Sequence, residues 1–364
     1  MVMFKIIAKE KDARTGILQT RHGKVETPFF MPVATKTAVK YLDPRDLEEI
    51  GVRTIISNSF VLSLRPGTKL IKKAGGIHKF MNFHNCIFTD SGGFQKMRES
   101  FSTKITEKGV VFKSPFDGKV QLITPKDAMK IQEDIGSDIA MALDDMPLYG
   151  SSKEDVKKSL VRTHRWALEC LKYHKDKKQL LFGIAQGGVY KELREESAKF
   201  IGGLAFDGVA FGGLAIGETS KETRDMINLS VKHFPSDKVR YLMGVGNPRQ
   251  LVEAISAGVD CFDSTFPTQN ARHGTLFTSL GKLMIENAKY KEDLKPVDVD
   301  CGCYVCKNYS RAHVRHLLKM KEANGLRYAT YHNIYFLNNL MKDIRVAIKL
   351  GKFENFKKEF LKKY

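Results

Sequence analysis

Short apolar runs rich in β-branched residues recur along the chain, and most of them are followed by a stretch with helical periodicity. Each run ends at, or directly before, a polar residue or a glycine. The runs are Phe29–Ala34, Thr54–Asn58, Cys86–Asp90, Asp138–Asp144, Leu180–Gln186, Gly208–Gly213, Arg240–Gly246 and Val259–Ser264. Runs that are apolar on both faces and separated by helices are typical of parallel strands. Eight of them predict an α/β fold, a closed (β/α)8 (TIM) barrel that occupies residues 1–364 as one domain.

Two connections between the predicted strands are longer than a barrel needs. Residues 99–125 contain two β-branched runs around a turn, which is the pattern of a β-hairpin insertion. Residues 266–335 contain a cysteine cluster and are expected to form a second insertion. In residues 336–364 the phenylalanines are spaced to form the apolar stripe of a docked helix, and the other face of that helix is basic.

The cysteine cluster predicts a metal site. Cys301, Cys303 and Cys306 fall within six residues, and thiolates at this turn-like spacing suit zinc. Zinc requires a fourth ligand, for which His332 is favoured because the two nearer histidines fall on the helix predicted in between. Three thiolates and one imidazole leave no coordination position for water, so the predicted Zn2+ is structural. Three unligated thiols are the alternative.

The charge balance indicates a nucleic-acid partner. Sixty Lys and Arg residues against 41 Asp and Glu give the 364-residue chain a formal net charge of +19. Surplus lysines can simply keep a protein soluble, but here basic residues gather on the predicted C-terminal helix, which suits a phosphate backbone. The hydrophobic fraction of 42% excludes a mainly disordered chain. A mean hydropathy of −0.29 and short apolar runs predict no membrane helix, and the first residues do not form a signal peptide, so a cytoplasmic protein is expected.

Polar residues that end the predicted strands converge on one mouth of the barrel, where the chemistry of this fold sits. They include the carboxylates of Asp90, Asp144 and Asp263 and the amide of Gln186. One such aspartate is most simply a helix N-cap, but three in one barrel favour a shared site. Two carboxylates can catalyse a displacement at a sugar anomeric carbon, one as nucleophile and one as acid/base. A further carboxylate with an amide can bind the edge of guanine. The residues alone therefore predict removal or exchange of a base on a nucleic acid, with the target nucleotide extruded into the pocket.

Several segments, in order along the chain, are similar to motifs of the tRNA-guanine transglycosylase family, the queuine tRNA-ribosyltransferases of bacteria and eukaryotes. These segments are Asp90–Gln95, Gln186–Gly188, Gly212–Glu218, Met243–Gly246 and Cys301–Cys306 with His332. The resemblance implies a zinc-carrying barrel that replaces guanine at the anticodon wobble position of tRNA with a 7-deazaguanine, in queuosine biosynthesis, without cutting the RNA chain. It also implies tRNA with a G-U-N anticodon, guanine and 7-deazaguanine bases, and a second copy of the chain in a homodimer as partners.

The resemblance assigns a role to each matching residue. Asp263 corresponds to the nucleophile that forms a covalent enzyme–RNA intermediate, and Asp90 corresponds to the acid/base. The implied base-binding residues are Ser91, Gly92, Gly93, Phe94, Asp144, Gln186, Gly213, Leu214 and Met243. The implied RNA-contacting residues are Gly244, Val245, Gly246, Asn247, Pro248, Arg249, Gln250, Thr268, Gln269, Asn270, Ala271 and Arg272. The implied zinc ligands are Cys301, Cys303, Cys306 and His332.

Several positions depart from the family pattern, among them Asn58–Val61, which replaces the usual Asn-Thr-Tyr-His and has no interpretation from the sequence. Gln269 stands where the bacterial pattern has an arginine, which removes a charge and a forked donor near the anticodon bases. Met146 and Ile216 are bulky beside the expected position of the 7-substituent. They favour 7-aminomethyl-7-deazaguanine over the larger queuine as the incoming base.

Other functions stay open on the sequence. One is a non-catalytic tRNA-binding partner subunit of the same family, although the presence of both Asp90 and Asp263 argues against it. Another is a transglycosylase that acts at a different tRNA position or on DNA. The last is a zinc-stabilised RNA-binding barrel without chemistry.

Overall fold

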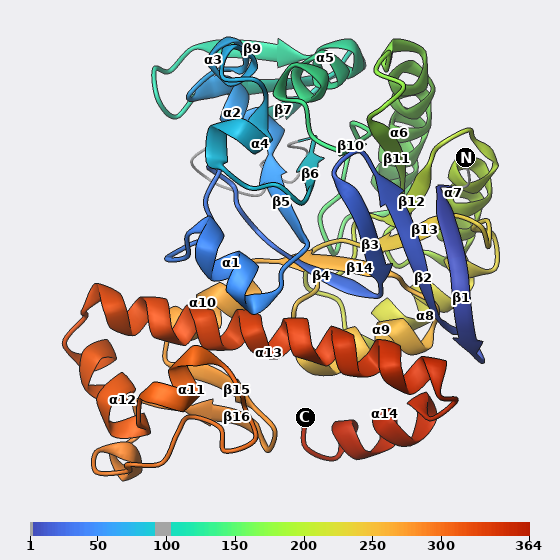
Figure 1. The fold of residues 1–364 in the computed structure, drawn as a ribbon. Coiled ribbons are helices and arrows are strands. Elements are labelled where there is room, and N and C mark those ends of the chain that lie inside the picture. Colours follow the sequence, from blue (N-terminus) through green and yellow to red (C-terminus); the bar gives the residue numbers. More distant parts are fainter. Residues whose placement is uncertain (1–2, 92–102) are drawn as a thin grey trace.

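The computed structural model describes residues 3–91 and 103–364. Its largest sheet contains the strands β4 (Phe29–Pro32), β5 (Thr54–Asn58), β6 (Cys86–Asp90), β10 (Ile139–Met141), β11 (Leu180–Ala185), β12 (Gly208–Phe211), β13 (Val239–Leu242) and β14 (Cys261–Ser264). All pair in parallel, in the order β4-β14-β13-β12-β11-β10-β6-β5 (Figure 1). A parallel bridge between Val33 and Ile56 joins the two edge strands. The sheet is thus a (β/α)8 barrel, and the predicted fold class is confirmed.

Several strands end earlier than their apolar runs. The run Arg240–Gly246 is a strand only as far as Leu242, because Gly244 has a φ of +78°, a left-handed conformation that does not continue a strand. In the same way β12 ends at Phe211, two residues before Gly213 with its φ of +65°. The chain therefore leaves the sheet where the predicted site residues begin.

A three-stranded antiparallel sheet, which the sequence pattern did not predict, covers the N-terminal end of the barrel. Its strands are β1 (Phe4–Glu10), β2 (Ala13–Thr20) and β3 (Gly23–Thr27). Phe4, Leu18 and Val25 pack against the inward-facing side chains of the barrel strands. The buried side chain of Arg14 on β2 forms an ion pair of 2.5 Å with Asp260, directly before β14. The sheet thus closes the end of the barrel opposite the predicted site.

Asp138, directly before β10, forms a second contact at this end. One of its oxygens accepts hydrogen bonds from the His22 backbone N–H at 3.0 Å and pairs with His22 Nδ1 at 2.9 Å. The other oxygen lies 2.9 Å from both His78 Nε2 and the Ile87 backbone nitrogen. Burial raises the pKa of Asp138, but the hydrogen bond and charge of His78, together with the bonds from Ile87 and His22, more than offset it, so the net pKa lies below the ordinary value.

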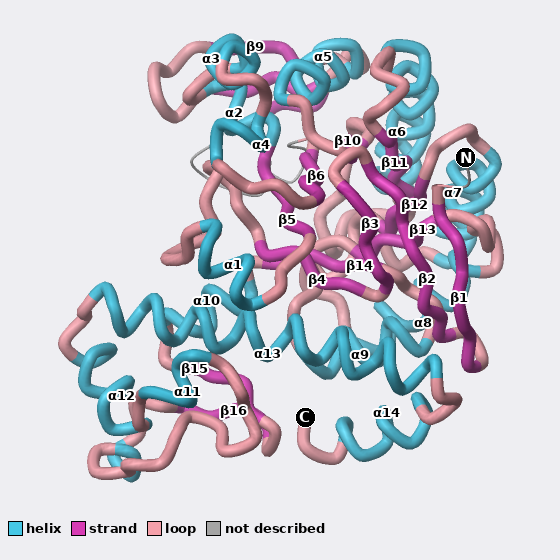
Figure 2. Tube along the Cα trace, in the orientation of Figure 1, coloured by secondary structure: helices cyan, strands magenta, loops and turns pink. Residues whose placement is uncertain are grey.

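Helices cover the outside of the barrel (Figure 2). They are α1 (Pro44–Ile50), α2 (Ser59–Leu64), α3 (Thr68–Lys73), α4 (Ile77–Met81), α5 (Pro125–Ile135), α6 (Lys153–Tyr173), α7 (Lys191–Gly203), α8 (Ser220–Val231), α9 (Pro248–Ser256) and α10 (Phe266–Arg272). Among the described residues, none of the helices is both long and apolar enough to span a bilayer.

The two long connections form their own small structures. The first contains the antiparallel strands β7 (Thr103–Ile105), β8 (Val110–Lys113) and β9 (Val120–Ile123). The second contains β15 (Thr275–Thr278), β16 (Gly281–Met284), a 3-10 turn (Ala288–Tyr290), α11 (Tyr304–Asn308) and α12 (Arg311–Lys319). The long helix α13 (Ala323–Lys349) then crosses the molecule and is followed by α14 (Phe353–Leu361). In Figure 1 the second connection lies beneath one end of α13, and α14 lies beneath the other.

Candidate active site and metal site

Asp263 lies on β14 at the barrel mouth, and one oxygen of its carboxylate is held by two hydrogen bonds. Its Oδ1 accepts a hydrogen bond from the Tyr241 hydroxyl at 2.6 Å and another from the Gly244 backbone N–H at 3.0 Å. Burial raises the pKa of Asp263 above the ordinary value, although both hydrogen bonds act to lower it. Both donors therefore favour the charged form of this carboxylate against the effect of burial.

Asp90 is the last residue of β6 and pairs in register with Asn58 at the end of β5. Asn58 Nδ2 donates to Asp90 Oδ2 at 3.1 Å, and the Ser59 hydroxyl donates to the Asp90 backbone carbonyl at 2.5 Å. Burial raises the pKa of Tyr241 well above its usual range, and the charge of Asp263, with a smaller effect from Asp90, raises it further. Asp263 thus contacts the Tyr241 hydroxyl directly, while Asp90 acts on its pKa only through charge.

Asp144 and Gln186 lie together in the predicted base-recognising part of the mouth. Gln186 Nε2 donates to Asp144 Oδ2 at 2.5 Å, and both side chains are buried. Gln186 Oε1 is buried and has no hydrogen-bond partner in the described part of the chain. Such an oxygen is costly unless a ligand donates to it. A Cβ at Gly213 would lie 2.5 Å from this oxygen, so the glycine keeps the approach open.

A cavity of about 150 Å3 adjoins Gly213. It is lined by Pro147, Leu148, Tyr149, Gly150, Ser151, Val156, Gly188, Val189, Tyr190, Gly213 and Ile216. Met146 also lies here, since its Cγ is 3.7 Å from the position that a Cβ on Gly213 would take. Met146 and Ile216, the two bulky residues noted in the sequence, therefore stand beside a cavity next to Asp144 and Gln186, the predicted base-recognising pair.

The remaining predicted base-binding residues are also near strand ends. Ser91 is buried and follows β6 directly, Leu214 is buried after β12, and Met243 is partly buried beside Gly244. Gly92, Gly93 and Phe94 lie outside the described residues.

Three residues of the mouth were not assigned roles from the sequence. Asn58 and Tyr241 hold the two carboxylates, and Glu218 accepts hydrogen bonds from the backbone N–H groups of Ala215 and Ile216. The N–H of Ala215 and the carbonyl of Leu214 belong to the same trans peptide and point in opposite directions. Because Glu218 binds this N–H, the Leu214 carbonyl points away from Glu218. The one sequence signal that could have found them is their position, since each of these residues lies on a barrel strand or in the segment that follows one.

The predicted RNA-contacting segments flank Asp263. Residues 244–250 lead from β13 into α9, and residues 268–272 belong to α10, which follows β14. Gly244 and Gln269 are exposed, while Asn270 Nδ2 donates to the Phe266 carbonyl at 2.9 Å. The Arg249 guanidinium donates to the carbonyl oxygens of Leu361 and Tyr364 at 2.7 and 2.9 Å. In this structure Arg249 therefore anchors the C-terminal end of the chain.

The predicted metal ligands come together where the second connection meets α13. The Sγ atoms of Cys301, Cys303 and Cys306 lie 3.8, 3.6 and 3.4 Å from His332 Nδ1. Zinc bonds to sulfur and nitrogen at tetrahedral angles would place these atoms about 3.6 Å apart. His332 Nε2 lies 2.7 Å from the Phe277 carbonyl oxygen, which leaves Nδ1 as the ligand atom. The four residues therefore form a site that could bind a metal ion.

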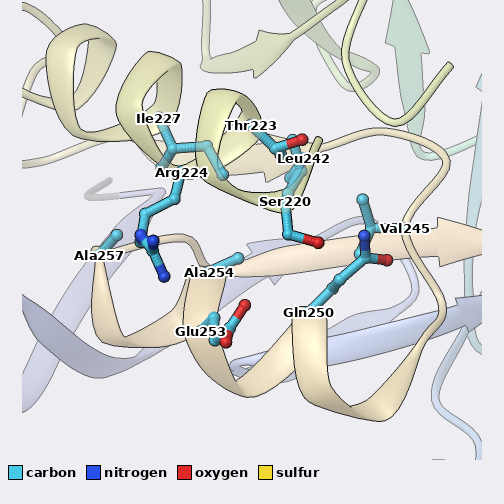
Figure 3. A pocket seen from close by; sticks show the side chains of 10 residues that line it. All are labelled: Ser220, Thr223, Arg224, Ile227, Leu242, Val245, Gln250, Glu253, Ala254 and Ala257. Atoms are coloured by element: carbon cyan, nitrogen blue, oxygen red, sulfur yellow. The ribbon is translucent and has the colours of Figure 1, made fainter. Parts of the chain in front are cut away.

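A further cavity lies between α8 and α9, and two of the predicted RNA-contacting residues, Val245 and Gln250, help to line it. Figure 3 shows it with its lining residues Ser220, Thr223, Arg224, Ile227, Leu242, Val245, Gln250, Glu253, Ala254 and Ala257. Its volume of about 20 Å3 has room for a single water and is far too small for a purine. The barrel mouth is the candidate active site because it holds the strand-end carboxylates and the bonded Asp144–Gln186 pair.

The fold and the mouth define a (β/α)8-barrel enzyme with carboxylates at its strand ends and a buried amide–carboxylate pair. A family model described as "Queuine tRNA-ribosyltransferase" matches residues 9–364. Relatives of that name are 48% identical in Halothermothrix orenii and 49% identical in Caldanaerobacter subterraneus subsp. tengcongensis, each over 100% of this chain and 98% of the relative. A relative of the same name in Staphylococcus haemolyticus is 49% identical over 98% of this chain and 94% of its own. The chain belongs to the queuine tRNA-ribosyltransferase family, and its activity is tRNA-guanine exchange in queuosine biosynthesis, as the sequence predicted.

Proposed function

We propose that the barrel mouth performs this exchange by two displacements through a covalent enzyme–RNA intermediate. Asp263 attacks the ribose anomeric carbon, and Asp90 donates a proton to the departing guanine. The incoming base then displaces Asp263 and returns a proton to Asp90. The observation that carries the proposal is that Asp90 and Asp263 stand at the ends of parallel barrel strands at one mouth, where Asp263 Oδ1 accepts hydrogen bonds from Tyr241 and Gly244. Two displacements on one carbon retain its configuration.

The leaving and incoming bases are recognised by Asp144 and Gln186. The bonded amide and carboxylate present a planar edge, and the unpartnered Gln186 Oε1 accepts a hydrogen bond from the base. The segments around Asp263, residues 244–250 and 268–272, hold the RNA. We place the target guanine at the anticodon wobble position of tRNA with a G-U-N sequence, in the cytoplasm, with the chain acting as a homodimer.

The incoming base is 7-aminomethyl-7-deazaguanine, because bulky side chains stand beside Gly213. Ile216 lines the cavity next to Gly213 and Met146 lies beside the same glycine, so both occupy space that the cyclopentenediol group of queuine would need.

The metal is zinc, since three thiolates and an imidazole at tetrahedral spacing are its usual structural ligands. When bound, it supplies a closed cross-link between the Cys301–Cys306 segment and α13 and takes no part in the reaction. One zinc ion per chain in elemental analysis of the purified protein is the expected result.

The test is incorporation of radiolabelled guanine into unmodified tRNA with a G-U-N anticodon. A tRNA with the wobble guanine replaced is the control. Label in the first tRNA alone establishes exchange at that position. Label in both tRNAs, or in duplex DNA, moves the target elsewhere, and tight tRNA binding without label indicates a non-catalytic partner subunit. An Asp263→Ala variant that still forms a covalent adduct with tRNA would rule out Asp263 as the nucleophile.

A further inference from the structure

We propose that Tyr241 is a positioning residue that selects which oxygen of Asp263 attacks the ribose and that helps this carboxylate to leave in the second displacement. This inference rests on the proposed function, in which Asp263 is the nucleophile. Tyr241 was read from the sequence only as one of the apolar residues of a strand.

The Tyr241 side chain is fixed inside the barrel. It is fully buried on β13, and its ring contacts the Phe88 ring edge-on at a centroid distance of 5.9 Å. Tyr241 pairs in register with Cys261, so Asp263, two residues further along β14, lies on the same face of the sheet. The register therefore places the hydroxyl against the carboxylate, where it lies 2.6 Å from Oδ1.

Both hydrogen bonds that other described residues make to this carboxylate end on Oδ1. The second comes from the Gly244 backbone N–H, at 3.0 Å. The positive φ of Gly244, +78°, turns this N–H toward Asp263, and a residue with a side chain would be strained there. With Oδ1 held between two donors, Oδ2 is the oxygen that can bond to the ribose.

The hydrogen bonds from Tyr241 and Gly244 have a different effect on the first displacement than on the second. In the first, a bond forms between Oδ2 and C1′ while the C1′–N9 bond breaks; the electron pair goes to the base, which takes a proton from Asp90. Oδ1 then becomes the carbonyl oxygen of an uncharged ester, and hydrogen bonds to it weaken. In the second, N9 of the incoming base bonds to C1′ and passes its proton to Asp90, and the electron pair of the breaking C1′–Oδ2 bond restores the carboxylate. Tyr241 and Gly244 thus stabilise the carboxylate relative to the ester and favour its departure.

The test is Tyr241→Phe, which keeps the ring and removes the hydroxyl. The Tyr241 hydrogen bond lowers the pKa of Asp263, so its loss raises that pKa and moves the acidic limb of the kcat/KM profile to higher pH. The covalent adduct with tRNA should persist about tenfold longer when free base is added, which is the scale of one charge-assisted hydrogen bond. The dissociation constant for tRNA should change less than about twofold. The adduct is measured on denaturing gels.

Tyr331→Phe is the matched control. Tyr331 is also a buried tyrosine, on α13, and its hydroxyl interacts with Glu49 rather than with the mouth. It should leave both the pH profile and the adduct lifetime unchanged. If Tyr241→Phe does not fold, 3-fluorotyrosine at position 241 tests the same bond. Its more acidic hydroxyl is a stronger donor, so the acidic limb should move to lower pH.

The outcomes separate this inference from the proposed function. If Asp263→Ala forms no adduct while Tyr241→Phe keeps the wild-type acidic limb and adduct lifetime, the positioning role is overturned and the nucleophile assignment stands. If Asp263→Ala still forms the adduct, the nucleophile assignment itself is wrong.

Discussion

Aspartates stand at both ends of the barrel, but their carboxylates have different numbers of donors. At the N-terminal end, Asp260 Oδ1 accepts from Arg14 Nε at 2.9 Å, and its Oδ2 accepts from Arg14 Nη2 at 2.5 Å and the Arg240 backbone N–H at 2.7 Å. Asp138 has two nitrogen partners on each oxygen. At the mouth, the described neighbours of Asp263 bond to Oδ1 alone.

The difference follows from what closes each end. The β1–β3 sheet brings Arg14 and His22 to the N-terminal end, so the carboxylates there are satisfied within the protein. At the mouth the strands run out into glycine-containing turns, and Gln186 Oε1 is left without a partner among the described residues. Asp138 and Asp260 are fully buried and have more donors, whereas Asp263 is partly exposed and has fewer, so exposure and donor count together separate the stabilising aspartates from the proposed nucleophile.

The largest expected effects come from two aspartates of the same strand region, Asp260 and Asp263. Asp263→Ala should reduce base exchange by about 10^4-fold or more, as removal of a catalytic nucleophile does, with little loss of stability. Asp260→Ala should lower the free energy of unfolding by about 3–5 kcal/mol, because it leaves the Arg14 guanidinium buried and unpaired. Urea denaturation and labelled-guanine exchange measure the two effects. Equal destabilisation by both substitutions would refute the distinction between the two ends.

The barrel and its mouth could be predicted because their patterns are strong. Strands buried on both faces are continuous apolar runs, and a parallel barrel collects their last residues at one edge. The β1–β3 sheet was missed because β2 buries the polar Arg14 and Thr15, which are satisfied by Asp260 and by the Thr27 carbonyl. Hydrophobic periodicity does not record a buried charge that is paired.

The hydrogen-bonding residues around the proposed catalytic aspartates could not be predicted for a related reason. Tyr241 has the apolar character expected of a strand residue, and its role depends on the register between β13 and β14. Glu218 and Asn58 act through hydrogen bonds that depend on where each turn ends. A sequence pattern gives the strand, whereas the partner of a hydroxyl or carboxylate is fixed only when two strands are placed side by side.

A smaller effect is expected for Asp138→Asn. The variant should lose about 1–3 kcal/mol of stability at pH 7, because its hydrogen bonds with the histidines and backbone weaken, while exchange per folded molecule is unchanged. The pKa of Asp138 is lowered in the folded protein, so its contribution is present above the pKa of an unfolded aspartate and is lost as pH falls through the lower folded value. The difference between variant and wild type should therefore shrink below about pH 4.

The control for Asp138 is Asp134→Asn. Asp134 lies on α5 and pairs with the exposed Lys72 and Lys130, so its loss should cost less than about 1 kcal/mol. Unfolding in urea at pH 7 and at acid pH compares the three proteins. A deficit of Asp138→Asn that grows toward acid pH would contradict the assigned direction of the pKa shift.

The smallest effect on stability is expected for Gln186→Leu at the mouth. Leucine has a similar volume, so the substitution loses the hydrogen bond to Asp144 but also removes an unpartnered buried oxygen, and the net change should stay within about 1 kcal/mol. Guanine affinity, measured by equilibrium dialysis, should fall about tenfold, because the base loses one acceptor. Strong destabilisation would place Gln186 with Asp138 as a structural group. Unchanged affinity would show that the unpartnered oxygen does not meet the base, and the donor count would then fail as a guide to which polar groups of this barrel serve its substrate.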